Sequence, residues 1–185
     1  MRRAGITLAG EEATAALGRA LAAHLSPGDT VLLSGPLGAG KTHLARAAIR
    51  ALTHDGREVP SPSYTLVQDH GGIWHVDLYR LGDPSEVDEL GLEEAFGSAI
   101  VLLEWPERLD APPAGALTVH LTDGAPREAA LAWTAPRWDA AVRDARIETF
   151  LASAGHSGAA RAPLPGDWSA RRYERLDGLD RKSVV

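Results

Sequence analysis

The segment that most constrains this chain is Gly35-Pro36-Leu37-Gly38-Ala39-Gly40-Lys41-Thr42. It matches the phosphate-loop pattern G-x-x-x-x-G-K-[ST] at every fixed position. Glycines let successive backbone N–H groups turn inward around an anion, and a helix beginning beside Lys41 adds its positive end. We therefore expect residues 37–42 to bind phosphates, with Lys41 on the outer phosphates and Thr42 on Mg²⁺.

The residues on either side of this loop favour the same interpretation. Residues 30–34, Thr-Val-Leu-Leu-Ser, predict a short buried strand that runs directly into the loop. After the loop, Leu44, Ala48 and Leu52 recur every four residues, as on the buried face of a helix. The chain has only two lysines, and one of them, Lys41, stands where a phosphate loop needs it. A glycine-rich turn that precedes a helix by chance is the weaker alternative.

The remaining pattern predicts an alternation of helices and strands. Residues 11–25 predict a helix, residues 61–63 an extended entry, and residues 64–70 and 73–80 two strands joined by a hairpin at Gly71-Gly72. We also expect short helices at residues 83–90 and 92–96, a strand buried on both faces at 99–103, a strand pair at 117–121 and 129–133, and a helix at 137–151. From residue 152 onward, Gly, Ser, Pro and Arg without periodicity predict a flexible tail.

Length and charge set the class of protein. With 185 residues the chain suits one domain, which we place at residues 1–151, followed by the Arg-containing tail at residues 152–185. The net charge of −6 gives no electrostatic reason to bind nucleic acid or an anionic membrane directly. The absence of cysteine fits a reducing cytoplasm, and no apolar run approaches a membrane span. We therefore expect a cytoplasmic protein with no membrane partner.

Two acids are candidates to complete a phosphate-loop site. Hydrolysis at such a loop needs acids that hold Mg²⁺ and orient water, and these normally follow a neighbouring apolar strand. Glu104 comes after five apolar residues, which is the stronger pattern. Asp77 ends Trp74-His75-Val76-Asp77, where alternation puts His75 and Asp77 on the same face. From the residues alone, either acid could instead be a solvated strand-end charge.

Five segments together carry a resemblance to a known family. They are the phosphate loop, Ser61-Pro62-Ser63-Tyr64-Thr65-Leu66-Val67, His75-Val76-Asp77-Leu78-Tyr79-Arg80-Leu81, Glu89-Leu90-Gly91-Leu92-Glu93 and Glu104-Trp105-Pro106-Glu107. Their order resembles that of the TsaE (YjeE) family, the bacterial ATPase needed to make threonylcarbamoyladenosine in tRNA. The resemblance runs from about residue 11 to residue 133.

The resemblance implies a three-layer α/β fold of the P-loop NTPase kind, with a mostly parallel sheet and antiparallel hairpin strands. It implies ATP or ADP with Mg²⁺ as cofactors, slow hydrolysis coupled to partner proteins, and Thr42 and Glu104 as the metal ligands. Asp77, Lys41 and Glu104 would then be the catalytic residues. Glu11 and Arg127, the latter in the loop before the last strand, would contact the nucleotide.

The implied partners are a threonylcarbamoyl transferase and its dimer partner, with tRNA reached indirectly through that complex. Residues 61–65 would act as a nucleotide-sensing switch. Two positions depart from the family pattern: His43 replaces a second hydroxyl residue after Thr42, and Ser63 replaces a usual threonine. Neither departure removes an expected metal ligand. Glu11 is equally well explained as a first-turn acid of a helix.

Two other functions compete with this interpretation. A small-molecule P-loop kinase would suit the length, but it needs an Arg-bearing lid, and the region after Glu104 offers only a hairpin with Arg127. A nucleotide-gated assembly factor, in which hydrolysis only resets a complex, overlaps with the family function. A GTPase is excluded because its guanine-reading Asn/Thr-Lys-x-Asp element needs a lysine, and Lys182 lies in the wrong context.

Overall fold

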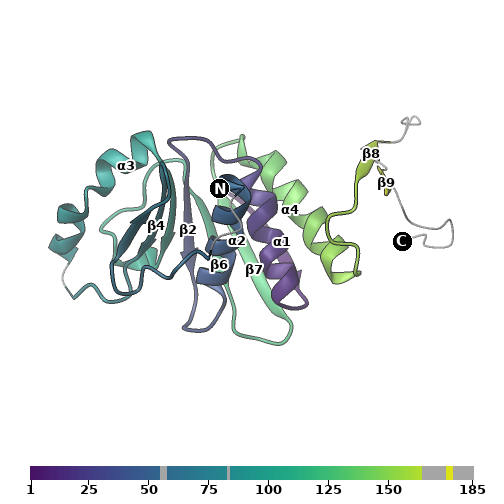
Figure 1. The fold of residues 1–185 in the computed structure, drawn as a ribbon, viewed down its shortest axis with the longest axis horizontal. Coiled ribbons are helices and arrows are strands. Elements are labelled where there is room, and N and C mark those ends of the chain that lie inside the picture. Colours follow the sequence, from purple (N-terminus) through teal and green to yellow (C-terminus); the bar gives the residue numbers. More distant parts are fainter. Residues whose placement is uncertain (55–57, 83, 164–173, 177–185) are drawn as a thin grey trace.

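The computed structural model describes residues 1–54, 58–82, 84–163 and 174–176. Its centre is a seven-stranded sheet with the strand order β1-β7-β6-β2-β5-β4-β3 (Figure 1). The strands of this sheet are β1 (Arg2–Leu8), β2 (Thr30–Ser34), β3 (Val67–Asp69), β4 (Ile73–Asp77), β5 (Ile100–Glu104), β6 (Leu117–Leu121) and β7 (Arg127–Trp133).

The middle of the sheet is parallel and its edges are antiparallel. Strand β2 pairs in parallel with β5 and β6, and β5 pairs in parallel with β4. The hairpins β3–β4 and β6–β7 and the pair β1–β7 are antiparallel. The expected mostly parallel sheet with antiparallel hairpin strands is therefore confirmed. Because β2 and β5 have a neighbour on each side and helices on each face, all residues of β5 are buried.

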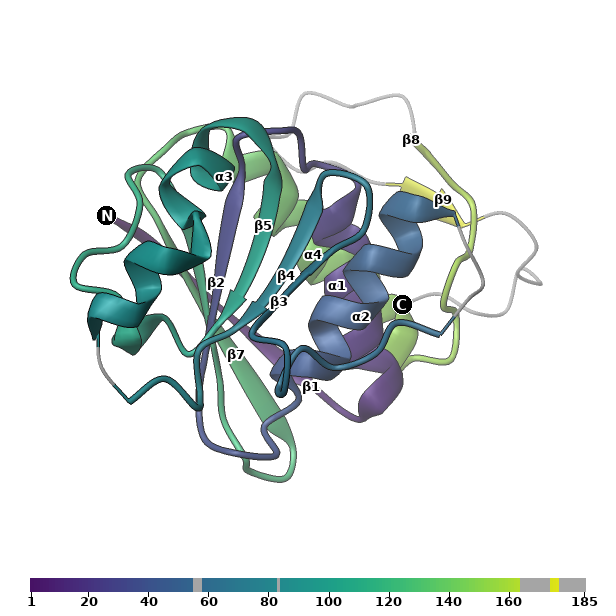
Figure 2. The same ribbon diagram turned by 60° about the vertical axis from the view of Figure 1, so that its left-hand side comes forward.

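Helices cover both faces of the sheet and make three layers (Figures 1 and 2). Helices α1 (Glu11–Ala22), α2 (Lys41–Thr53) and α4 (Trp138–Ser153) lie on one face. Helix α3 (Leu92–Ser98) and the 3₁₀ segment η1 (Pro84–Leu90) lie on the other face. Alternation along β2 divides its apolar side chains between two buried clusters. Val31 and Leu33 pack in the cluster under α1, α2 and α4, and Leu32 packs in the cluster under α3.

Three predicted elements, α1, β3 and β4, end three residues earlier or begin three residues later than expected. Helix α1 stops at Ala22 because the next residues make tighter i→i−3 bonds, such as Leu25 N–H to the Ala22 carbonyl, before Pro27. Strand β3 begins only at Val67, since Leu66 has a φ of 63° and donates to the Pro62 carbonyl, which closes a turn. The predicted extended entry at residues 61–63 is therefore wrong beyond Ser61, because Pro62 begins this turn.

Strand β4 ends at Asp77, three residues before the predicted end. The Asp77 carboxylate accepts a hydrogen bond from the Tyr79 backbone N–H, and such a local bond offers the chain an alternative to the ladder. Two expected helices are present: α3 runs to Ser98, and the other takes a 3₁₀ form as η1. The predicted cap of η1 at Asp83 lies outside the described residues.

The C-terminal segment contains more order than its composition suggests. Helix α4 runs to Ser153, and β8 (Arg161–Pro163) pairs antiparallel with β9 (Glu174–Leu176) beyond α4 (Figure 1). Arg161 connects this pair to α4 through ion pairs with Asp144 and Glu148. Sequence reasoning missed these contacts because two three-residue strands leave no periodic pattern. The rest of the predicted tail, residues 164–173 and 177–185, lies outside the described residues.

Gly18 of α1 lies against α2 with no room for a side chain. A Cβ built on Gly18 would lie 2.5 Å from the Leu44 backbone carbonyl oxygen. We expect Gly18→Ala to lower the free energy of unfolding by about 1–3 kcal/mol, because the helices must separate to admit the methyl group. Gly97→Ala in α3 is the matched control, since nothing lies within 4 Å of its Cβ position. Denaturant unfolding curves of both variants test this, and equal stability of Gly18→Ala and wild type would contradict it.

In the described part of the chain, each helix is too short or too polar to cross a membrane.

Candidate nucleotide-binding site

The phosphate loop joins the C-terminal end of β2 to the first turn of α2. At Gly35 φ is 128°, and a Cβ there would lie 2.1 Å from the Leu121 carbonyl oxygen. Gly40 precedes the first turn of α2 with a φ of 101°. Both positions need glycine, one for close approach to β6 and one for its left-handed backbone. The first N–H groups of α2 consequently face the loop, where they form the positive end of the helix.

Lys41 lies under the loop and only 4% of it is exposed. Its ammonium donates to the carbonyls of Gly35 at 2.7 Å and Pro36 at 2.8 Å. It also lies 3.8 Å from the centroid of the Trp105 ring, a cation–π distance. Burial lowers the pKa of Lys41, because it disfavours the charged form, and the nearby carboxylate of Glu104 opposes that shift.

Thr42 and Glu104 meet at the end of β5. The Thr42 hydroxyl donates to Glu104 Oε2 at 2.9 Å, and the other carboxylate oxygen, Oε1, lies 2.8 Å from His75 Nε2. Glu104 is 2% exposed and His75 is fully buried. A buried carboxylate with two hydrogen-bond partners keeps a defined orientation. The two residues expected to hold the metal are thus in direct contact.

Asp77 lies beside Glu104 at the end of the neighbouring strand. The two residues are register partners in the β4–β5 ladder, so both carboxylates leave the same face of the sheet. Asp77 Oδ2 accepts from the Ser63 hydroxyl at 2.7 Å, and Oδ1 accepts from the Tyr79 N–H at 3.0 Å. The Ser63 hydroxyl is in turn 2.8 Å from that of Ser61. The predicted switch segment is therefore bonded directly to this acid.

A cavity of about 230 Å³ brings most of the predicted site residues together. It lies between the phosphate loop, the ends of β4 and β5, and the turn that contains Ser63. Its walls are Leu37, Gly38, Gly40, Lys41, Thr42, His43, Ser63, Asp77, Tyr79, Glu104 and Trp105. Of the predicted loop residues, Ala39 is fully buried and belongs to the core cluster, whereas Leu37 is 73% exposed.

Arg127 contacts the phosphate loop from the β7 side of β2, opposite to β5 and β4. It is the first residue of β7, paired with Leu8 of β1, whereas the sequence placed it in the preceding loop. The strand begins earlier than predicted because β1 extends the ladder along its whole length. Arg127 Nη2 donates to the Gly38 carbonyl at 3.4 Å. Its guanidinium therefore lies within reach of an anion bound by the loop.

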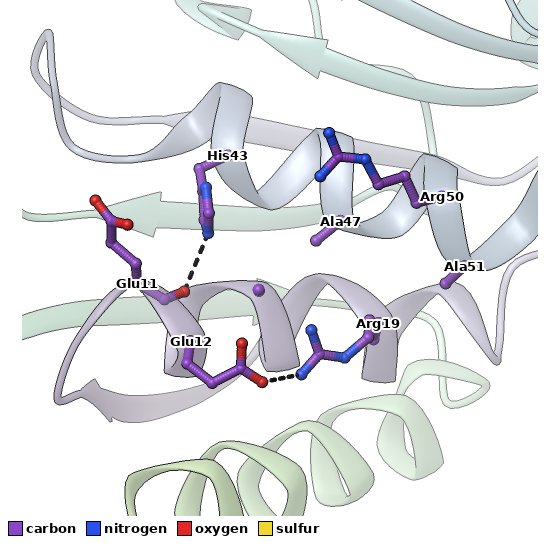
Figure 3. A pocket seen from close by; sticks show the side chains of 8 residues that line it. Glu11, Glu12, Arg19, His43, Ala47, Arg50 and Ala51 are labelled. Carbon is purple, nitrogen blue, oxygen red and sulfur yellow. Dashed lines mark hydrogen bonds and ion pairs between the residues drawn. The ribbon is translucent and has the colours of Figure 1, made fainter. Parts of the chain in front are cut away.

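Glu11 belongs to a second, larger cavity between α1 and α2 (Figure 3). This cavity has a volume of about 630 Å³, with Glu11, Glu12 and Arg19 on one wall and His43 and Arg50 among the residues of the other. His43 Nε2 lies 3.1 Å from the Glu11 carbonyl oxygen. His43 also lines the smaller cavity, so the two cavities share this residue.

Sequence reasoning did not find three contacts of the site. The bonds from His75 to Glu104 and from Ser63 to Asp77 needed the register of β3, β4 and β5. The alternation that puts His75 and Asp77 on one face was the available signal. The contact between Trp105 and Lys41 depends on the left-handed backbone of Trp105, whose φ is 64°, and no sequence pattern indicated that conformation.

The sheet with helices on both faces and the glycine loop at the start of α2 define the fold class as that of the P-loop NTPases. YdiB of Bacillus subtilis has a similar solved structure, with a TM-score of 0.62 and 25% identity over 79% of this chain and 95% of YdiB. The sequence model described as "Threonylcarbamoyl adenosine biosynthesis protein TsaE" matches residues 8–129. The chain belongs to the TsaE family.

Curated relatives agree with this family. A protein of Rickettsia conorii is 44% identical over 105 residues, which are 55% of this chain and 60% of that protein. A protein of Rickettsia felis is 39% identical over 64% of this chain and 73% of its own length. A protein of Haemophilus influenzae is 42% identical over 46% of this chain and 56% of its own length. Each is named "tRNA threonylcarbamoyladenosine biosynthesis protein TsaE".

Proposed function

We propose that this chain binds ATP and ADP with Mg²⁺ and hydrolyses ATP slowly, in support of threonylcarbamoyl transfer to adenosine in tRNA. The observation that carries the proposal is one cavity in which Lys41, Thr42, Asp77 and Glu104 converge at the phosphate loop. The names of the relatives supply the biosynthetic role. The transfer itself belongs to a transferase and its dimer partner, in the cytoplasm, and tRNA is reached through that complex.

The donor set beside the loop fits Mg²⁺. Thr42 offers a hydroxyl and Glu104 a carboxylate, both hard oxygen ligands, at the position where the outer phosphates would lie. When bound, Mg²⁺ would neutralise charge that develops on the phosphates. Lys41 would share that task, and the N–H groups of residues 37–42 would hold the phosphates in place. Asp77 would orient and deprotonate the attacking water.

The base and ribose have room in the cavity between α1 and α2. The cavity at the loop, about 230 Å³, suits the phosphates, and it shares His43 with the larger cavity lined by Glu11. Arg127 would add positive charge near the phosphates from the opposite side of the loop. These placements support Glu11 and Arg127 as nucleotide contacts.

An exposed surface of this chain that could bind partner proteins lies next to the same site. Tyr64 is 83% exposed, Tyr79 is 44% exposed and Leu37 is 73% exposed, although large apolar and aromatic side chains are usually buried. Tyr64 belongs to the proposed switch at residues 61–65, which is bonded to Asp77 through Ser63. A change at the outer phosphate would then alter the surface offered to the transferase pair. Such a switch acts only through contacts that differ between the nucleotide states.

Competition binding tests the nucleotide specificity. We expect ATP and ADP, with Mg²⁺, to displace a fluorescent ATP analogue, and GTP to displace it only weakly. The reason is that the chain lacks the lysine-containing guanine element and offers residues of the α1–α2 cavity to the base. Omission of Mg²⁺ is the control for the metal. Equal displacement by GTP and ATP would contradict the base preference, and no displacement by either would contradict the proposed function.

A further inference from the structure

A histidine lies deep in the sheet behind the proposed metal ligand. His75 is in the middle of β4, is fully buried, and places Nε2 2.8 Å from Glu104 Oε1. Its register partner on β5 is Leu102, two residues before Glu104, so the two side chains are diagonal neighbours on one face. The apolar neighbours on this face, Ile73, Ile100 and Leu102, belong to the core cluster under α2.

The surroundings of His75 do not favour a packing role. A leucine could supply similar apolar volume here without the cost of burying ring nitrogens. Within the described residues, His75 Nδ1 has no hydrogen-bond partner, so the ring makes its polar contact through Nε2. An ionised carboxylate only accepts hydrogen bonds, so we assign to His75 the tautomer with its proton on Nε2. Burial removes water from the ring nitrogens of His75, and the hydrogen bond to Glu104 offsets part of that cost.

No other side chain near Glu104 takes over this task. In the described part of the chain, the side-chain partners recorded for the carboxylate are Thr42 on Oε2 and His75 on Oε1. Asp77, although adjacent, directs its oxygens to Ser63 and to the Tyr79 N–H. Thr42 is itself a proposed metal ligand, so it cannot serve as a fixed support. His75 is therefore the support that lies outside the proposed ligand set.

We propose that His75 is a positioning residue for the metal-binding carboxylate: by donating to Oε1 it keeps Oε2 directed at Thr42 and the cavity. This inference rests on the proposed Mg²⁺-nucleotide function. Groups that orient a metal ligand from behind are typically worth about 10- to 100-fold in metal affinity. His75 acts on Glu104 and not on the nucleotide, so its removal should affect the contribution of Mg²⁺ and spare metal-free nucleotide binding.

The test measures affinity for a fluorescent ATP analogue during a Mg²⁺ titration, starting from EDTA. We expect His75→Leu to raise the Mg²⁺ concentration for half-maximal effect by about 10- to 100-fold, with metal-free affinity unchanged. His75→Gln, whose amide N–H can donate to the same oxygen, should recover part of the shift. His70→Leu is the matched control, because His70 lies in the turn of the same hairpin and, among the described residues, its Nε2 has no hydrogen-bond partner. Thermal melting checks that each variant folds.

Each other result has a defined meaning. An unchanged Mg²⁺ requirement in both His75 variants would overturn the positioning role while leaving the proposed function intact. An equal loss of affinity with and without Mg²⁺, matched by His70→Leu, would also overturn it, because that pattern reports a loosened hairpin. A wild-type protein whose analogue binding ignores Mg²⁺ would overturn the proposed metal site, and the role of His75 with it.

Discussion

Replacing Lys41 by alanine is expected to weaken ATP binding by about 10- to 150-fold. The change removes a charge-assisted hydrogen bond to the outer phosphates, worth about 1.5–3 kcal/mol. Lys41 is nearly buried. Its ammonium is bonded to the Gly35 and Pro36 carbonyls and covered by Trp105, so it is held at the phosphate loop. Isothermal titration with ATP and Mg²⁺ measures the effect.

Lys182→Ala is the matched control, since it removes the chain's only other lysine and the same charge. We expect this control to bind ATP as the wild type does. Circular dichroism melting establishes that the Lys41→Ala protein is folded. An unchanged affinity in folded Lys41→Ala would mean that the ammonium does not reach the phosphates.

Replacing Asp77 by asparagine is expected to lower ATP turnover by about 10²- to 10⁴-fold at saturating Mg²⁺, the range for loss of a positioned base. The amide cannot take a proton from water, although it can still bond to the Ser63 hydroxyl and the Tyr79 N–H. Affinity for ATP should change little, because neither oxygen of Asp77 is assigned to the phosphates or the metal. Phosphate release at several Mg²⁺ concentrations, with the partner proteins present, measures this rate.

Glu104→Gln is the companion variant to Asp77→Asn. A neutral amide is a poorer ligand for a hard cation, so this variant should need more Mg²⁺ and regain turnover when Mg²⁺ is in excess. Rescue of Asp77→Asn, and not of Glu104→Gln, by excess Mg²⁺ would show that the two acids have exchanged roles.

Local signals in the sequence were sufficient for most of the sheet. Strand β2, the phosphate loop and α2 follow from an apolar run, fixed glycines and a four-residue repeat, all of which act over short distances. The apolar run that predicted β5 correctly indicated a strand covered on both faces. Short-range patterns failed where a side chain or turn competes with the ladder, as at Leu66 and at Asp77. They also failed at β8 and β9, two three-residue strands that Arg161 joins to α4 through ion pairs.

The candidate site was predicted as a set of residues, and its connections were not. Lys41, Thr42, Asp77 and Glu104 are recognisable because chemistry restricts which residue types follow a strand or a glycine loop. The bond from His75 to Glu104 joins residues 29 positions apart and needs the register of two parallel strands. The contact of the Trp105 ring with Lys41 needs a left-handed backbone conformation at Trp105, which no sequence pattern indicated.

Reconstitution of tRNA modification would test the proposed role of the chain most directly. Purified transferase, its dimer partner, tRNA, ATP and the threonylcarbamoyl donor are combined with the wild-type chain, with Lys41→Ala, or without either. We expect several rounds of threonylcarbamoyladenosine formation per transferase pair with the wild-type chain only, because in the proposed function nucleotide binding controls its association with the pair. Equal product with wild type and Lys41→Ala, or without the chain, would contradict a nucleotide-dependent role in this modification.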